Sequence, residues 1–446
     1  MPELTTEDRL PRNLGLCSAA AVLVGTTIGS GIFLTPSIVA KAVGSPVPML
    51  ALWALAGVIT LTGALSIAEM AAAFPRSGGI FAYILEAYGR LPAFVYGWAE
   101  LTVIRAAAMG GISTVFARYL RELVVFPKED ERVVAAALIV AIALLNYVGI
   151  SYAAALMNFT TVLKYGALLG LTFFAFGAGS GDVGHFTLVA PGSVVTGSVM
   201  LTALVRIMWA YDGWSNLSFV GGEVKDPGRA LPRALILGTS AIVLIYLLVN
   251  AAYLYLLSTE EIAGADRVAA LAVSRIPLFG AAGASIMAGI VMLSGFGSVN
   301  GTLMTGPRIF FAMSEQRLFF PLIARVSPRF KTPSAAIWLA AGLGVAYVLQ
   351  NNFQQLAERF VLGTWPFYAL AVAAVYTLRI RRPNMPRPYR TWGYPVTPGL
   401  FLLASVGMVV NAIVTNPRDN VVTFGIILTG IPAYFAWKWW EARSRR

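Results

Sequence analysis

The sequence has very little cysteine, histidine or charge. Cys17 is its one cysteine and His185 its one histidine, so no disulfide can form within the chain and no cluster of such ligands for zinc is available. Only 12% of the 446 residues are charged, whereas 58% are hydrophobic. These proportions exclude an ordinary soluble protein and are typical of a chain that lies in a lipid bilayer. We therefore expect the protein to bind no cofactor or metal ion. We also expect that it is not an enzyme, because the chain lacks the residues for most catalytic nucleophile and metal sites.

Apolar runs of about 20 residues, the length that a bilayer requires, recur from one end of the chain to the other. They predict an all-α polytopic membrane protein, a single transmembrane domain over residues 1–446 with twelve transmembrane helices. The predicted spans are 14–42, 47–74, 91–117, 132–150, 155–179, 194–222, 231–257, 278–306, 333–350, 358–379, 396–415 and 419–438. The chain begins with the polar segment MPELTTEDRLPRN, and the apolar run after it is too long for a signal peptide, so we expect the N-terminus to be retained.

The net charge of +12 lies mainly between the predicted spans, which argues against a nucleic-acid partner. If both termini lie in the cytoplasm, the segments on that side carry about 21 Lys and Arg residues and the opposite side about 9. This asymmetry predicts a multi-pass protein of the inner (cytoplasmic) membrane with both termini cytoplasmic.

The first and sixth predicted spans contain glycine and hydroxyl clusters near their middle, in VGTTIGSGIFLTPS and MWAYDGWSNLSFVGGE. Corresponding breaks in the first helix of two five-helix halves are typical of transporters built from inverted repeats. Such halves would cover residues 14–179 and 194–379, with the last two helices, 396–438, outside the repeat. Unwound backbone at bilayer depth lines a polar cavity, and its amides and carbonyls suit a zwitterion. The alternative is close helix packing, because Gly25 and Gly29 form a small-xxx-small pair.

Three basic residues, Arg105, Lys164 and Arg206, fall inside predicted spans, where each needs a partner or a function. Lys164 lies about 14 Å into the fifth span and is too deep to reach water comfortably. It either occupies a position where another transporter would bind a metal ion, and exchanges a proton there, or it is a structural lysine held by backbone carbonyls.

Asp212 is the strongest acidic candidate, because it lies within the second break, between Tyr211 and Gly213. It would either meet a cationic group or cap the exposed end of a half-helix. Arg206 precedes it closely enough to be considered as its neutralising partner. Glu69 and Glu100 are expected to pair with neighbouring cations rather than to bind substrate.

Several fragments, in this order, resemble one known family: VGTTIGSGIF, ALSIAEMAAAFPRSGGIFAYILEAYG, WAELTVIR, WAYDGWSNLSFVGGEVKDPGRALPRA and FGSVNGTLMTGPRIFF. The chain resembles the amino acid-polyamine-organocation superfamily over nearly its whole length, and within it the L-type amino acid transporters and their bacterial exchanger relatives. The resemblance implies a fold of two inverted five-helix repeats, with an amino acid bound between the broken first and sixth helices.

The resemblance also implies roles for individual residues. Main-chain groups of one segment would hold the α-carboxylate and α-ammonium of the substrate: Thr27, Ile28, Gly29, Ser30 and Gly31. Trp209 would lie over the substrate as a gate, and Asp212 would line the site without settling the preference for side-chain charge. Lys164 would stand in the place of a sodium ion, near Ser294 and Ser298. Thr364 and Trp365 would line the side-chain end of the pocket.

Two departures from the family pattern matter. The animal members carry a cysteine that links them to a heavy chain, but the corresponding stretch, residues 118–132, contains none. A disulfide-linked heavy chain is therefore not expected. Arg206 stands where the family usually has a small or apolar residue. This leaves open a preference for substrates with acidic or unusual side chains.

The sequence thus predicts a sodium-independent exchanger of small neutral, and also of cationic, L-amino acids that works by alternating access. Two alternatives stay open at this point: a proton-coupled amino acid symporter, and an amino acid sensor built on the same fold.

Overall fold

The computed structural model describes residues 12, 14–177, 181–189, 196–280, 282–320, 323, 327, 329–330 and 332–444. Most of the polar N-terminal segment lies outside these residues. The described residues form a helical bundle, and their only paired extended backbone is an isolated bridge between Leu14 and Val224. The predicted all-helical class is confirmed.

The first half of the chain contains eight α-helices and a π-helical turn, Glu100–Ile104. The helices are α1 (Leu16–Thr27), α2 (Gly31–Val43), α3 (Pro46–Ala73), α4 (Ile80–Tyr88), α5 (Arg90–Ala99), α6 (Arg105–Leu120), α7 (Glu131–Val148) and α8 (Ile150–Gly177).

The remaining helices all lie after residue 196. They are α9 (Gly197–Tyr211), α10 (Asn216–Phe219), α11 (Pro227–Leu256), α12 (Thr259–Gly264), α13 (Val268–Ser274), α14 (Ala282–Glu315), α15 (Ser334–Gln350), α16 (Phe353–Arg381), α17 (Val396–Thr415), α18 (Pro417–Leu428) and α19 (Gly430–Ser444).

Within the described ranges, nine helical stretches are long and apolar enough to cross a membrane, and the bent pair α1–α2 makes a tenth. The apolar helices α9 and α15 are shorter and coincide with the predicted sixth and ninth spans. Large apolar side chains lie exposed on the outside of the bundle, among them Val162 on α8, Leu237 on α11 and Leu403 on α17. Such side chains suit contact with lipid, and the chain is a multi-pass membrane protein.

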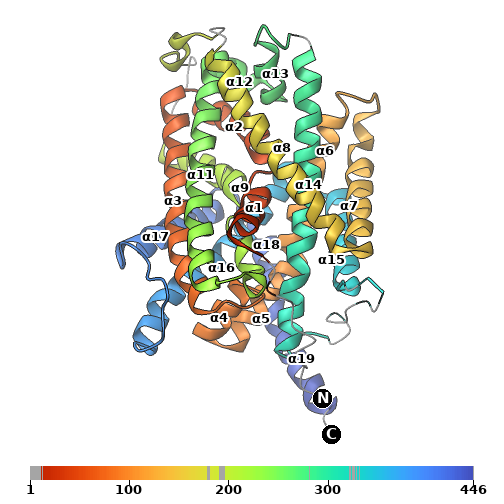
Figure 1. Cartoon of the computed structure of the whole chain (residues 1–446), viewed down its shortest axis with the longest axis vertical. Coiled ribbons are helices and arrows are strands. Elements are labelled where there is room, and N and C mark those ends of the chain that lie inside the picture. Colours follow the sequence, from red (N-terminus) through yellow and green to blue (C-terminus); the bar gives the residue numbers. More distant parts are fainter. Residues whose placement is uncertain are drawn as a thin grey trace.

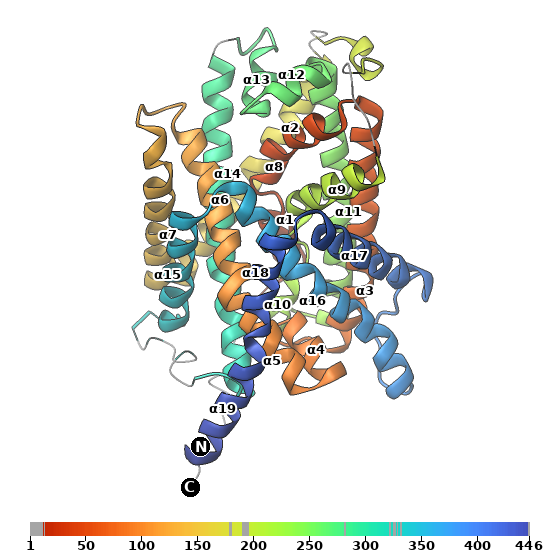
Figure 2. The same cartoon turned by 180° about the vertical axis from the view of Figure 1, so that it is seen from behind.

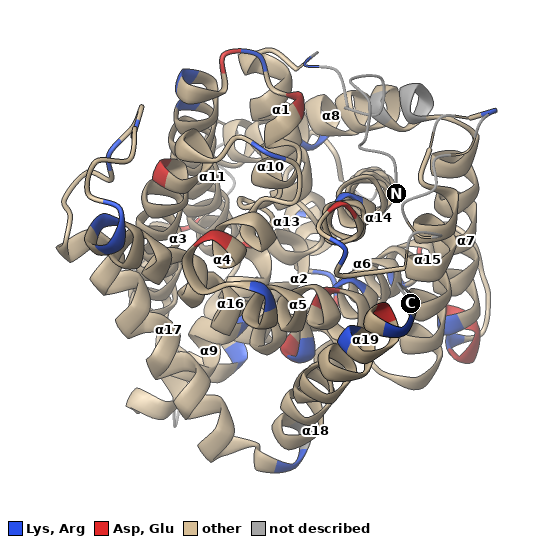
Figure 3. Ribbon diagram, turned by 90° about the horizontal axis from the view of Figure 1, so that it is seen from below, with Lys and Arg blue, Asp and Glu red and all other residues tan. Residues whose placement is uncertain are grey.

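The long helices α3, α11 and α14 run the length of the molecule, with α12 and α13 at one end and α4 at the other (Figures 1 and 2). We call the end with α12 and α13 the upper end and the end with α4 the lower end. A view onto the lower end shows that Lys, Arg, Asp and Glu take up a small part of the ribbon and are scattered over it (Figure 3). The helical bundle is therefore largely uncharged, as a bilayer requires.

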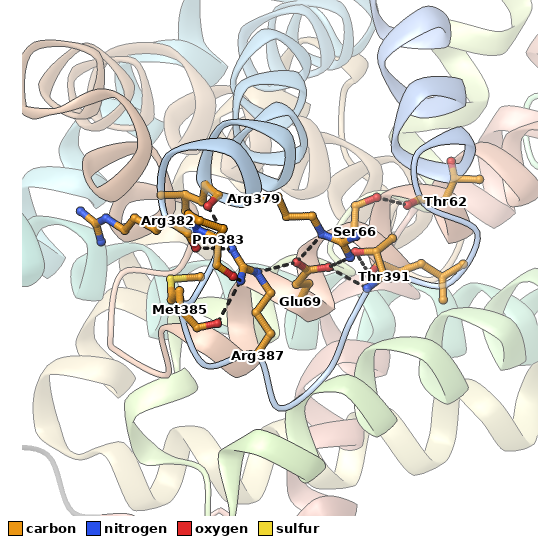
Figure 4. Close-up of polar contacts among 11 residues, drawn as sticks. Thr62, Ser66, Glu69, Arg379, Arg382, Pro383, Met385, Arg387 and Thr391 are labelled. Atoms are coloured by element: carbon orange, nitrogen blue, oxygen red, sulfur yellow. Dashed lines mark hydrogen bonds and ion pairs between the residues drawn. The ribbon is translucent and has the colours of Figure 1, made fainter.

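Glu69, near the lower end of α3, is buried within a cluster of cations (Figure 4). It accepts hydrogen bonds from Arg379 Nε at 3.0 Å and Nη2 at 2.6 Å, and from the backbone N–H of Thr391 at 2.7 Å. Arg387 Nε lies 3.3 Å from the same carboxylate and its guanidinium also donates to four backbone carbonyls. The prediction that Glu69 pairs with cations is confirmed, and the cluster fixes the connection between α16 and α17 against α3.

Candidate functional site

Both predicted helix breaks are present, and they face each other. The first lies between Thr27 at the end of α1 and Gly31 at the start of α2, where the chain bends by 41°. The second lies between α9 and α10 and contains Gly213, whose φ of +109° is in the region that favours glycine. A Cβ atom on Gly213 would lie 2.6 Å from the carbonyl oxygen of Thr26, so the two unwound segments are in direct backbone contact.

Tyr246 of α11 fastens the two breaks together. Its hydroxyl lies 3.1 Å from the carbonyl oxygen of Thr27 and 3.0 Å from that of Ala210, which belong to the last turns of α1 and α9. The side chain is fully buried and packs edge-on against Trp53 of α3. Sequence reasoning missed this role, because a tyrosine within an apolar helix resembles any other packing aromatic.

A cavity of about 40 Å³ lies between the breaks. Most of the residues predicted to bind the substrate line it, namely Thr27, Gly29, Ser30, Gly31, Trp209 and Asp212. Ile28 is fully buried and is absent from this lining; its N–H donates to Val24 and closes α1. The hydroxyl of Ser30 is buried without a hydrogen-bond partner among the described residues, so this wall of the cavity has an unused polar group.

Asp212 is hydrogen-bonded to Tyr368 of α16, which donates to its Oδ1 at 2.8 Å. The same hydroxyl lies 2.8 Å from Ser215 Oγ, so the second break is tied to α16. Arg206, which was considered as a neutralising partner of Asp212, pairs with Glu358 instead. Arg206 precedes Asp212 by about one and two-thirds helical turns, which puts the two side chains on different faces and at different depths.

Arg105, which also lines the cavity, pairs with Glu100 within the same span. Its Nε donates to Glu100 Oε2 at 2.7 Å, and Tyr96 donates to the other oxygen at 2.6 Å. Both charges are buried, and the π-helical turn from Glu100 to Ile104 separates them. The prediction that Glu100 pairs with a cation is confirmed, and the cation forms part of the cavity wall.

Lys164 joins three helices from α8. Its Nζ donates to the carbonyl oxygen of Gly25 on α1 at 3.0 Å and to Ser298 Oγ on α14 at 2.8 Å. The side chain is 1% exposed and neither contact is with a carboxylate. One turn of α14 away, Ser294 Oγ donates to the carbonyl of Gly29 at 3.3 Å, so α14 contacts the first break directly and is joined to α1 through Lys164.

Three aromatic rings close the cavity on its upper side. Trp209 packs edge-on against Phe353 and Phe360 of α16, with ring centroids 5.7 and 5.2 Å away. On α6, Gly111 leaves room for the indole, since a Cβ there would lie 2.7 Å from it. Phe360 lines the cavity, a role that the sequence did not reveal.

Thr364 and Trp365 lie outside the lining of this cavity. Trp365 stacks on Phe401 of α17, with centroids 5.1 Å apart and planes inclined by 15°. The hydroxyl of Thr364 is buried without a hydrogen-bond partner among the described residues. Their contact with substrate therefore stays a prediction.

No group of three or more His, Cys, Asp or Glu residues that could hold a metal ion occurs within the described part of the chain. A multi-pass helical bundle with two facing helix breaks around a small polar cavity is the architecture of a membrane transporter. The chain matches the amino acid permease family over residues 14–437. It belongs to this family of amino acid transporters, which are not enzymes.

Curated relatives support this assignment along the whole chain. The serine/threonine exchanger SteT of Bacillus subtilis is 30% identical over 97% of this chain and 98% of its own length. The human cystine/glutamate transporter is 31% identical over 98% of this chain and 87% of its own length. The human b(0,+)-type amino acid transporter 1 is 30% identical over 96% of this chain and 88% of its own length. The predicted resemblance is confirmed.

Replacing Tyr246 by phenylalanine should slow amino acid transport about tenfold. The change keeps the ring but removes the hydroxyl whose single proton is shared between the carbonyl oxygens of Thr27 and Ala210, a contact worth about 1–1.5 kcal/mol. Initial uptake rates in proteoliposomes measure the effect. Tyr165→Phe, on α8, serves as the control, and equal rates for the two variants would contradict this role for Tyr246.

Proposed function

We propose that this protein is a sodium-independent exchanger of small neutral L-amino acids, with cationic ones as further substrates, working by alternating access. The two inverted five-helix repeats cover residues 14–179 and 194–379, and residues 396–438 stand outside them. The chain then crosses the inner (cytoplasmic) membrane twelve times, with α9–α10 and α15 as the sixth and ninth crossings. The lower end, where α19 ends, faces the cytoplasm, and both termini lie on that side of the membrane.

The observation that carries this proposal is the pair of facing breaks. The first N–H groups of α2, beside the unpartnered Ser30 hydroxyl, have no partner within the helix and attract an α-carboxylate. The carbonyl oxygens at the ends of α1 and α9 attract an α-ammonium. Thr26 and Thr27 at the end of α1 and Gly31 at the start of α2 line the same cavity, so a zwitterion placed there can satisfy both kinds of group at once.

The cavity, at about 40 Å³, has to widen to admit an amino acid, and a small side chain requires the least widening. Asp212 and Asn216 give it polar lining suited to a hydroxyl group, and the carboxylate of Asp212 also suits a cation. The serine/threonine exchanger among the relatives supports both the small substrates and the exchange mode. We expect the protein to work without a disulfide-linked heavy chain, because residues 118–132 contain no cysteine.

The position of Lys164 supports the proposed sodium independence. Its ammonium supplies a positive charge to the Gly25 carbonyl and the Ser298 hydroxyl, oxygen atoms of the kind that would otherwise ligate a sodium ion. A fixed cation between α1, α8 and α14 makes a bound sodium ion at the same place unfavourable.

Competition against uptake of labelled serine, with sodium replaced by choline, tests the binding mode. We expect small L-amino acids to compete, and expect no competition from analogues that lack either the α-carboxylate or the α-amino group. Equal competition by ethanolamine, which lacks the carboxylate, would overturn the binding mode. A requirement for sodium would overturn the role of Lys164.

A second candidate is proton-coupled symport, which is favoured by the absence of a carboxylate from the two contacts of Lys164. A lysine without an ionic partner can release and regain a proton during the cycle. An imposed pH gradient across vesicles without internal amino acid distinguishes the two, since it drives uptake by a symporter but not by an exchanger.

A further inference from the structure

Arg206 carries a charge at membrane depth but does not line the central cavity. Its Nη2 lies 3.2 Å from Glu358 Oε1, so the contact links α9 to α16. The two side chains are 21% and 23% exposed, which is more than either partner of the Arg105–Glu100 pair below them. This ion pair is therefore open to solutes.

The pair lies on a path between the upper surface and the central cavity. A vestibule of about 830 Å³ opens at the upper end and is lined by Arg206, Phe353 and Gln354 among others. A smaller cavity below it shares Arg206 and Phe353 with the vestibule and adds Trp209 and Glu358. Trp209 also lines the central cavity. A solute that descends this path meets Arg206 and Glu358 before it reaches Trp209.

The two charges are joined by a single hydrogen bond. At 3.2 Å it is longer than the buried contacts of Arg105 with Glu100, at 2.7 Å, and of Arg308 with Glu223, at 2.6 Å. Gln354 lies beside the guanidinium, and its amide oxygen, in the orientation that satisfies both amide atoms, accepts from Arg206 Nη2 at 2.7 Å. The ion pair can therefore separate while the guanidinium of Arg206 keeps its hydrogen bond to Gln354.

We propose that Arg206 and Glu358 form an outer subsite that binds the zwitterionic backbone of an amino acid before it passes Trp209. Arg206 receives the α-carboxylate and Glu358 the α-ammonium, so each charge exchanges one partner for another and neither is left unpaired. The proposal rests on the proposed function, because it takes amino acids as the substrates, but it concerns a place outside the central cavity.

An amino acid bound at this subsite would also weaken the packing of Trp209 against Phe353 and Phe360. Arg206 and Trp209 are three residues apart on α9 and lie on the same face of the helix. Glu358 lies on α16 between Phe353 and Phe360, the rings that pack against Trp209. Opening the ion pair and parting these rings both separate α9 from α16, so binding at the subsite favours entry.

Exchange kinetics measured separately from the two faces of the membrane test this inference. Vesicles with one verified orientation are used, and Vmax/KM for labelled serine is determined at the vestibule face and at the opposite face. For Arg206→Gln and for Glu358→Gln we expect Vmax/KM at the vestibule face to fall about tenfold. The value at the opposite face should stay within about twofold, which also shows that each variant is folded and transports.

Lys41→Gln is the matched control, because Lys41 lines the same vestibule away from the path to Trp209. It should leave both values unchanged, and an equal fall would mean that general attraction by vestibule cations explains the effect. If the pair only holds α9 against α16, the variants would instead raise Vmax/KM at the vestibule face and lower it at the other. Either result, or no change at either face, would overturn the subsite. If the wild-type protein shows no exchange of labelled serine, the proposed function itself is overturned.

Discussion

Replacing Lys164 by alanine is expected to reduce amino acid exchange about 100-fold or more while the protein stays folded. The change removes two charge-assisted hydrogen bonds, to the Gly25 carbonyl and to Ser298, that hold the first break against α8 and α14. Each such bond is worth about 1.5–3 kcal/mol, and about 1.4 kcal/mol corresponds to a factor of ten in rate. Without the lysine, the Gly25 carbonyl is buried with no donor and the geometry of the break is lost.

Initial exchange rates in proteoliposomes, together with the elution profile of the purified protein in detergent, measure this outcome. Ser298→Ala is the graded control, because it removes one of the two bonds and leaves the ammonium on Gly25. We expect it to lose about tenfold. Wild-type kinetics in the Lys164→Ala variant would remove the case for a functional lysine.

Gly213→Ala is expected to abolish transport and to lower the free energy of unfolding by about 3 kcal/mol. Two independent causes act at this position. Its φ of +109° is strained for any residue with a side chain, and the new Cβ would lie 2.6 Å from the Thr26 carbonyl oxygen and 2.8 Å from the Thr27 Cα. The two breaks would have to separate, and the cavity between them would lose its shape.

The matched control is Gly170→Ala, in the middle of α8, where a Cβ has no atom within 4 Å and the backbone is helical. This substitution should leave transport intact and leave stability unchanged or slightly raised. Thermal unfolding and uptake rates of the two variants, measured side by side, separate the effect of the break from that of adding a methyl group. Similar behaviour of both variants would contradict the close approach of the breaks.

The transmembrane helices were largely predictable because the bilayer imposes one length and one composition on each. The predicted span 396–415 coincides with α17, and 333–350 differs from α15 by one residue. The breaks were also predictable, because glycine and hydroxyl clusters at bilayer depth need a polar surrounding. The short helices α4, α12 and α13 were missed, since they have no spanning length to reveal them, and so was the π-helical turn between Glu100 and Ile104.

The site was predictable only as far as local sequence determines it. Lys164 and Ser298 were both singled out, and the structure brings them within 2.8 Å. The link between Tyr246 and the two breaks depends on how α11 packs, and nothing in the residues around Tyr246 indicates it. The partner of Arg206 was mistaken for the same reason, because Glu358 belongs to a helix far along the chain.

The most direct test of the central claim, an amino acid exchanger that needs no sodium, is uptake of labelled serine into sodium-free proteoliposomes with and without unlabelled serine inside. We predict rapid uptake into loaded vesicles and at most about a tenth of that rate into empty ones, since an exchanger returns across the membrane only when loaded. Equal uptake into empty vesicles, or uptake that appears only when sodium is added, would contradict the account.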